Sequence, residues 1–204
     1  MRKISASPDA IEHLGSDPKM RGLIADYGAL SRERNPKLFG ALCESIIAQQ
    51  ISTKAYLSIL DKLSHSKIKL SVSDMLSADV SKLRKCSLPL RKIKWIKSAA
   101  AKFASGEINE RRIRSMPDAE ALAELTKLDG VGIWTAEMLL IFSLGRPDVL
   151  SYGDYGIRKG LCLLYGLERI SKGDFEIFRK RFSPYCTAAS LYLWALAGDP
   201  KYSA

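Results

Sequence analysis

Apolar residues recur along this chain every three or four positions, the spacing of a helix with one buried side. Between residues 37 and 52 the stripe consists of the pairs Leu38/Phe39, Leu42/Cys43 and Ile46/Ile47. The same period runs through most of the chain, and no convincing alternating strand, internal repeat or low-complexity linker interrupts it. The pattern predicts an all-α protein of roughly nine or ten helices.

Residues with strong capping preferences predict where several of these helices begin or end. Starts are expected at Ser73 or Asp74, near Pro117, near Asp154, at Ser171 or Asp174, and at Thr187. In "RKIKWIKSAAAKFASG" the Lys and Arg residues are expected mostly to face away from the apolar stripe, and Gly106 to end the helix.

The charge balance narrows the class of partner. A chain of 204 residues has room for one large domain or for two small lobes that share a cleft. Its formal net charge of +10 favours a polyanion, with nucleic acid first and an anionic membrane surface second. A merely soluble, positively charged surface explains the charge equally well.

The cysteines and the chain start carry further expectations. Cys43, Cys86, Cys162 and Cys186 are too far apart for a zinc or iron–sulfur spacing, so they are interpreted as small core residues in a reducing compartment. The opening "MRKISASPDAIEHLG" lacks the apolar region of a secretory signal, and no apolar run approaches the ~18 residues of a membrane span. We expect an intracellular soluble protein without a metal site.

Two glycines bracket one valine in "LDGVGIWTAEMLLIF" (Leu128 to Phe142). Gly130 and Gly132 can supply the positive φ of a sharp reversal, and Val131 can anchor the turn in the core. The next helix then presents free N–H groups near Gly130, Gly132 and Ile133, which with the helix dipole would bind one phosphate. The alternative is an ordinary αα-hairpin, which often uses one glycine.

A carboxylate follows about twenty residues later in "VLSYGDYGIRKGL". Asp154 precedes an apolar helical pattern, so its simplest role is an N-cap. A carboxylate on such a rigid element could also face a DNA cleft and stabilise a positively charged sugar. The two roles are compatible.

The hairpin together with "D-Y-x-I-R" at Asp154 resembles the helix-hairpin-helix DNA glycosylase superfamily. The resemblance runs from about Pro36 to Leu196 and is closest to the 3-methyladenine DNA glycosylase II (AlkA-like) branch, through "AQQIS", "LRKIKWIKSAA", "LDGVGIWTAEM" and "SPYCTAASLYLW". It implies one domain over residues 1–204, with two helical lobes flanking a DNA-binding cleft: about 36–115, and 1–35 plus 116–204. It also implies that Asp154 is catalytic.

The resemblance assigns a base pocket as well. Bifunctional relatives carry a strand-nicking lysine where this chain has Trp134, so base excision without strand cleavage is expected. Trp134 would stack on a cationic purine, and Tyr155 and Trp194 match two further aromatic positions, although core packing is the favoured explanation for each of these two alone. Met138 stands where some relatives place a pocket tyrosine, and "FSPYC" (residues 182–186) departs from the family's "W-x-P-[YW]-R". Both departures put substrate breadth in doubt.

The remaining implied contacts concern the DNA strand. The residues are Gly130, Val131, Gly132, Thr135, Gln50, Ser52 and Arg158. Arg158 and Lys159 are each expected to be a phosphate or surface contact. Gln50 falls at the position of the wedge that fills the gap left by an extruded base; alternatively, Gln49 and Gln50 only cap the preceding helix. The family often holds a monovalent cation (Na⁺ or K⁺) at the hairpin, and no other cofactor is expected.

These observations lead to one expected function and three alternatives. We expect a monomeric, monofunctional DNA glycosylase that removes 3-methyladenine or 7-methylguanine from double-stranded DNA, in the nucleoid of a prokaryote or the nucleus of a eukaryote. Such bases already carry a positive charge and need little acid catalysis, which suits a chain with only two histidines. The alternatives are a non-catalytic DNA-binding protein, a glycosylase for another damaged base, including a glycosylase-lyase for oxidised bases, and a membrane-surface protein.

Overall fold

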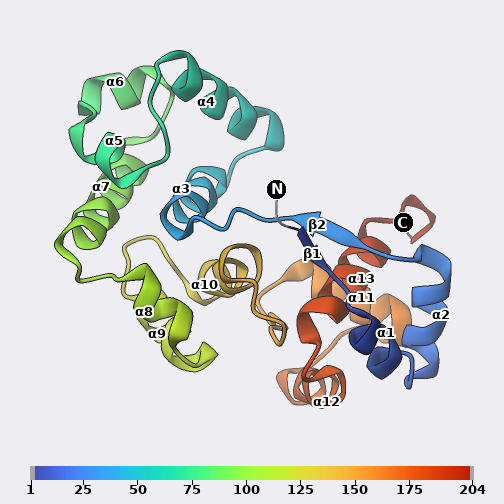
Figure 1. The fold of residues 1–204 in the computed structure, drawn as a ribbon. Coiled ribbons are helices and arrows are strands. Elements are labelled where there is room, and N and C mark those ends of the chain that lie inside the picture. Colours follow the sequence, from blue (N-terminus) through green and yellow to red (C-terminus); the bar gives the residue numbers. More distant parts are fainter. Residues whose placement is uncertain (1–2, 203–204) are drawn as a thin grey trace. The chain divides into compact units, whose positions relative to one another are not determined.

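The computed structural model describes residues 3–202, which divide into two compact units (Figure 1). Unit 1 contains the described residues up to Arg34 together with those from Leu140 onward, and unit 2 is Asn35–Leu139. Both units are built almost entirely of helices, so the expected all-α class is confirmed.

Every residue of unit 2 is described, and the unit contains eight α-helices. They are α3 (Leu38–Ala48), α4 (Thr53–His65), α5 (Val72–Ser77), α6 (Val80–Lys85), α7 (Leu90–Ser105), α8 (Glu110–Ser115), α9 (Asp118–Thr126) and α10 (Ile133–Leu139). The long helix α7 packs against α3, α5 and α6, while α10 packs against α3 and α9. Eight of the eleven residues of α3 are buried, as its apolar stripe predicts. This core fixes the C-terminal end of α3 and the N-terminal end of α10, which both contribute to the candidate site.

Unit 1 is organised around a helix that is apolar on all sides. Its elements are β1 (Lys3–Ser5), α1 (Pro8–Leu14), α2 (Pro18–Tyr27), β2 (Ser31–Glu33), the π-helix η1 (Leu140–Leu144), α11 (Tyr155–Tyr165), α12 (Lys172–Phe182), α13 (Cys186–Gly198) and the 3₁₀ turn η2 (Pro200–Tyr202). α13 packs most extensively against α11 and also against α2 and α12. Its Tyr192 is fully buried and donates a hydrogen bond to the Gly28 carbonyl at 3.0 Å.

The division between the units differs from the expected lobes. The sequence placed the second boundary near residue 115, whereas unit 2 extends to Leu139. The reason is packing: α9 lies against α8, and α10 lies against α3 and α9. The helices on both sides of the glycine turn therefore belong to unit 2.

The structure corrects the expectation that the chain has no strand. β1 and β2 form a two-stranded antiparallel sheet (Figure 1). In it Lys3 pairs with Glu33 and Ser5 with Ser31. Each strand has three residues, and all three residues of β2 are exposed. Strands this short and this exposed leave no apolar alternation for a sequence pattern to detect.

The helix count and two caps are also corrected. Residues 3–202 contain thirteen α-helices instead of nine or ten, because α1, α2 and α8 were missed and one expected helix is divided into α5 and α6. The N-cap of α5 is Ser71, with Asp74 three residues into the motif, and the N-cap of α13 is Tyr185. Thr187 lies inside α13, where its hydroxyl donates to the Arg146 carbonyl at 2.7 Å.

Other predicted ends are confirmed. Gly106 ends α7 in the left-handed conformation, with φ of 79°. Ser171 begins α12 in a capping box completed by Asp174, so both predicted residues take part in the same cap. Three of the four cysteines are buried and the fourth, Cys162, is half-buried; all four are free thiols. Burial raises the pKa of the Cys43 thiol, as expected for an inert core residue.

None of the helices described between residues 3 and 202 combines the length and the apolar character that crossing a bilayer requires.

A matched pair of substitutions in α12 tests the core of unit 1. Phe175 is 1 % exposed and contacts the Tyr152 ring edge-on, whereas Ile177, two residues away, is 57 % exposed. Phe175→Ala should lower the free energy of unfolding by about 3–5 kcal/mol. Ile177→Ala should change it by less than about 0.5 kcal/mol. Urea denaturation followed by circular dichroism measures both, and equal effects would contradict this description of the core.

Candidate functional site

The glycine turn between α9 and α10 is held against α7. Gly130 has a φ of 78°, the left-handed region that glycine tolerates. A Cβ atom added at Gly130 would lie 2.4 Å from Cε3 of Trp95, so the backbone touches the face of this indole ring. Val131 is 6 % exposed and anchors the turn in the core, as predicted. Position 130 therefore requires glycine both for its conformation and for its contact.

Gly132 plays a different part from the one expected. Its φ lies outside the left-handed region, and an added Cβ would meet no atom within 4 Å. The turn therefore does not need glycine at position 132 for its own conformation or packing. A bare backbone facing open space at the start of α10 is what a close approach by another molecule requires.

Polar contacts from α7 and from the end of α3 complete the support of the turn. The Ser98 hydroxyl donates to Oδ2 of Asp129 at 2.9 Å, and the Gln49 amide donates to the Gly130 carbonyl at 2.9 Å. The Arg91 guanidinium lies 4.8 Å from the centre of the Trp95 ring, in a cation–π contact. Trp95, Ser98 and Asp129 had no role predicted from the sequence.

A buried lysine of α7 caps the C-terminal end of α3. Lys92 of α7 is 6 % exposed, and its Nζ donates to the Ile47 carbonyl at 2.8 Å and to the Gln49 carbonyl at 2.6 Å. Burial lowers the pKa of this ammonium below its ordinary value, while the two carbonyl acceptors favour the charged form. Lys92 therefore caps the C-terminal end of α3. The side chain of Gln49, the C-cap residue of α3, contacts the glycine turn. The next residue, Gln50, is exposed and has a φ of 55°.

Predicted pocket and wedge residues line a common cavity in unit 2. The cavity has a volume of about 420 Å³ and is lined by Ser45, Ala48, Gln49, Gln50, Trp134 and Met138. Trp134 is 44 % exposed and Met138 is 9 % exposed. None of the six lining side chains carries a charge, so the cavity offers an aromatic ring, a thioether and neutral polar groups.

In unit 1, Asp154 is fixed at the start of α11. It is the N-cap residue, and its Oδ1 accepts hydrogen bonds from the Ile157 N–H and from Nε1 of Trp194, both at 2.9 Å. Asp154 as a whole residue is buried, at 8 % exposure. The predicted capping role is therefore confirmed, and a second donor, from α13, sets the orientation of the group. The catalytic role stays a prediction.

Two aromatic residues, Trp194 and Tyr155, lie next to Asp154. Trp194 is half-buried and stacks on Phe142 at 5.6 Å between ring centroids, so it combines packing with its bond to the carboxylate. A Cβ added at Gly156 would lie 2.8 Å from Cδ1 of Trp194, which explains the glycine next to Tyr155. Tyr155 is 72 % exposed, so core packing, the favoured explanation from sequence, is wrong for this residue.

The other predicted DNA contacts differ in their accessibility. Ser52 is exposed and caps α4, accepting from the Ala55 N–H at 3.2 Å. Thr135 is only 4 % exposed, so its side chain faces the interior and only its backbone could serve the predicted contact. Lys159 is half-buried and donates to the Ala197 carbonyl at 3.0 Å, and its predicted phosphate or surface contact stays a prediction. Arg158 is half-buried, with its guanidinium 5.4 Å from the centre of the Tyr152 ring.

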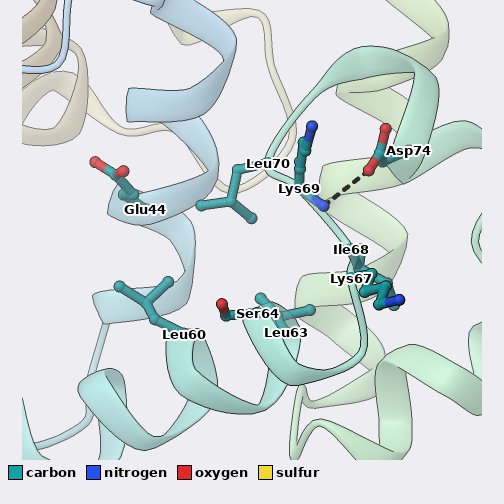
Figure 2. Close-up of a pocket in the computed structure, with 9 residues that line it drawn as sticks. All are labelled: Glu44, Leu60, Leu63, Ser64, Lys67, Ile68, Lys69, Leu70 and Asp74. Atoms are coloured by element: carbon teal, nitrogen blue, oxygen red, sulfur yellow. Dashed lines mark hydrogen bonds between the residues drawn. The ribbon is translucent and has the colours of Figure 1, made fainter.

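A second, larger cavity of unit 2 contains none of the predicted site residues. Figure 2 shows Glu44 from α3, leucines from α4, and the segment 67–70 around a space of about 830 Å³. Burial raises the pKa of the Glu44 carboxyl, which accepts from the Asn35 amide at 3.0 Å. Asp74 accepts from the Lys69 N–H at 2.8 Å (Figure 2). The lining mixes two carboxylates with two lysines and does not point to one ligand.

Among residues 3–202 no three histidine, cysteine, aspartate or glutamate side chains come together in a way that could hold a metal ion.

A helical protein with a glycine turn of this kind, gripped between α3 and α7 and open at Gly132, belongs to the helix-hairpin-helix class. A family model described as HhH-GPD superfamily base excision DNA repair protein matches residues 43–184. The chain therefore belongs to this superfamily.

Individual relatives agree with this assignment. DNA-3-methyladenine glycosylase 1 of Schizosaccharomyces pombe is 30% identical over 186 residues, which cover 89% of this chain and 82% of the relative. The crystal structure of a DNA-3-methyladenine glycosidase from Bacillus halodurans superposes with a TM-score of 0.86 at 31% identity, covering 97% of this chain and 93% of that one. The S. pombe 3-methyladenine DNA glycosylase in complex with abasic DNA gives a TM-score of 0.80 at 29% identity, covering 96% and 100%.

The two glycines of the turn should respond differently to the same substitution. Gly130→Ala places a Cβ against Trp95 in a strained backbone conformation and should lower the free energy of unfolding by about 2 kcal/mol or more. Gly132→Ala adds a methyl group in open space and should change it by less than about 0.5 kcal/mol. Urea denaturation of both variants checks the prediction; a Gly130→Ala protein as stable as Gly132→Ala would refute the described contact.

Proposed function

We propose that this protein is a monomeric, monofunctional DNA glycosylase. In this proposal it extrudes an alkylated purine, 3-methyladenine or 7-methylguanine, from double-stranded DNA and hydrolyses the N-glycosidic bond. Membership of a base excision repair superfamily, together with relatives named as 3-methyladenine glycosylases, supports the substrate class. The observation that carries the catalytic part is the carboxylate of Asp154.

Asp154 has the properties that cleavage of a glycosidic bond requires. Two donors meet at its Oδ1, from the backbone of Ile157 and the indole of Trp194, so the group cannot rotate freely. A fixed negative charge in a nearly buried position stabilises an oxocarbenium-like sugar more strongly than a mobile carboxylate in water would. The same carboxylate can orient the attacking water and accept its proton as the new C–O bond forms.

The leaving group needs less help from the protein. An alkylated purine bears a positive charge in the duplex and departs as a neutral base, so no side chain has to protonate it. Within the cavity of unit 2, the half-exposed Trp134 offers a π face to such a cationic ring. Met138 forms part of the apolar wall beside it.

The turn supplies the grip on DNA in this proposal. The open backbone at Gly132 and the first N–H groups of α10 are suited to a phosphate, because a helix begins with unsatisfied donors and a positive dipole end. Such contacts hold the strand without reading bases. We further propose that Gln50, exposed at the rim of the cavity, occupies the gap left by the extruded base.

A monovalent cation at the turn fits the donor set. Oxygen atoms, including those of backbone carbonyls, are the ligands that hard cations prefer, and residues 128–132 of the turn each carry one such carbonyl. The Leu128 carbonyl accepts from the Val131 N–H and the Gly130 carbonyl accepts from Gln49, which leaves each a second lone pair. A bound cation would add positive charge beside the phosphate.

Substitution of Asp154 by asparagine separates capping from catalysis. Asparagine is as good an N-cap as aspartate and can keep an oxygen acceptor for Trp194, but it carries no charge. Asp154→Asn should lower release of 7-methylguanine from a methylated duplex by about 10³-fold, while affinity for undamaged duplex stays within about threefold. Free base is measured by chromatography and binding by fluorescence anisotropy.

The control is a second N-cap of unit 1. Asp17 caps α2 through the N–H groups of Lys19 and Met20, and Asp17→Asn makes the same chemical change there. It should leave excision unaltered. An Asp154→Asn protein that excises at the rate of the Asp17→Asn protein would reduce Asp154 to a cap and remove the basis of the enzyme proposal.

The absence of lyase chemistry is tested separately. Trp134 has no nucleophilic nitrogen, so incubation with methylated duplex and sodium borohydride should trap no covalent protein–DNA adduct. Abasic sites should accumulate unnicked until alkali is added. Denaturing gel electrophoresis shows both results, and a trapped adduct would establish a glycosylase-lyase instead.

A further inference from the structure

The loop after α3 is tied to the glycine turn by an unbroken chain of hydrogen bonds inside unit 2. Lys92 of α7 donates to the carbonyls of Ile47 and Gln49, at 2.8 and 2.6 Å. The Gln49 side chain then donates to the Gly130 carbonyl at 2.9 Å, and the same nitrogen lies 3.5 Å from Oγ1 of Thr135. These contacts therefore connect Gln49, the residue before Gln50, with Gly130, two residues before Gly132.

Removal of the Lys92 side chain would leave the C-terminal end of α3 without its cap. An α-helix ends with carbonyls that lack intrahelical partners. The bond from Lys92 to the Ile47 carbonyl is buried, so water cannot easily replace the lysine there. Beyond this cap, Gln50 adopts a left-handed φ of 55°, which a residue other than glycine keeps only when its neighbours hold it there. The cap therefore sets the direction in which Gln50 leaves the helix.

We propose that Lys92 and Gln49 are positioning residues that couple the Gln50 loop to the glycine turn, so that the wedge and the phosphate grip act as one rigid body. This inference rests on the proposed function. It explains how the Gln50 loop and the glycine turn keep a fixed spacing along the DNA strand. A wedge that enters the base stack must stand at a fixed distance from the clamped phosphates. A small displacement loses much of the rate.

The chain contains a matched control for Lys92. Lys97 lies on the same helix, and its Nζ donates to the carbonyls of Met75 and Leu76 near the end of α5, both at 2.9 Å. Lys92→Met and Lys97→Met thus remove the same kind of contact from α7. Only the first affects the loop that carries Gln50.

The kinetic experiment uses single-turnover excision from a duplex with one 7-methylguanine. Lys92→Met and Gln49→Met should each lower the maximal excision rate about tenfold, with affinity for undamaged duplex unchanged within twofold. Lys97→Met should excise at the rate of the unsubstituted protein. In a Gln50→Ala background, Lys92→Met should cause no further loss, because its effect passes through the residue already removed.

Hydrogen–deuterium exchange of the free protein tests the coupling without any reaction. Lys92→Met should raise exchange in residues 48–53, and Gln49→Met should raise it there and also in residues 129–133. Lys97→Met should raise it only near the end of α5. Because Gln49 is half-buried and near the surface, its variant remains informative even where Lys92→Met reduces folding.

Three results would overturn the proposal. One is an excision rate within twofold of the unsubstituted protein for both Lys92→Met and Gln49→Met. Another is a loss for Lys92→Met of equal size with and without Gln50. The third is unchanged exchange at residues 129–133 in Gln49→Met. If the unsubstituted protein releases no alkylated purine, the proposed function fails, and the exchange result alone decides the coupling.

Discussion

A carboxylate removed from water must be given hydrogen-bond donors, and at Asp154 this requirement links α11 to α13, the central helix of unit 1. One donor is the backbone of α11, and a second is the indole of Trp194, forty residues later on α13. The close packing of these two helices keeps the indole in place, and the missing side chain at Gly156 lets it reach the carboxyl group. The N-cap that begins α11 and the group proposed for catalysis are consequently the same atoms.

In unit 2 the groups that need partners are the backbone carbonyls at the ends of helices. Two helices of its core, α3 and α5, each end against α7, which sends a lysine to each: Lys92 and Lys97. The buried ammonium of Lys92 is stable because carbonyl oxygens replace the water that it loses. Lys92, Trp95 and Ser98 lie at intervals of three residues along α7. A single helix therefore supports both the end of α3 and the glycine turn.

Local signals explain which features could be predicted from the sequence. Helical periodicity, the Asp154 cap and the reversal at Gly130 depend on neighbouring residues and were predicted correctly. The helices α1 and α2 were missed although Ser7-Pro8 and Asp17-Pro18 mark their starts, because their apolar stripes are short. Lys92 lies four residues before Ile96 and so on the buried face, yet a lysine there has meaning only once its distant carbonyl acceptors are known. The contacts of Trp95 with Gly130 and of Trp194 with Asp154 have no local signature at all.

The composition of the unit 2 cavity bears on how such an enzyme would discriminate between bases. Its lining contains neither a carboxylic acid nor an ammonium that could protonate a departing purine. A neutral, unmodified purine leaves as an anion unless it is protonated, and the side chains that line this cavity do not supply that proton. A cationic alkylated purine leaves as a neutral molecule and needs only the stabilised sugar. Under the proposed function, selectivity therefore comes from the bond that breaks more than from the fit of the base, and a cavity with few specific contacts can still spare normal DNA.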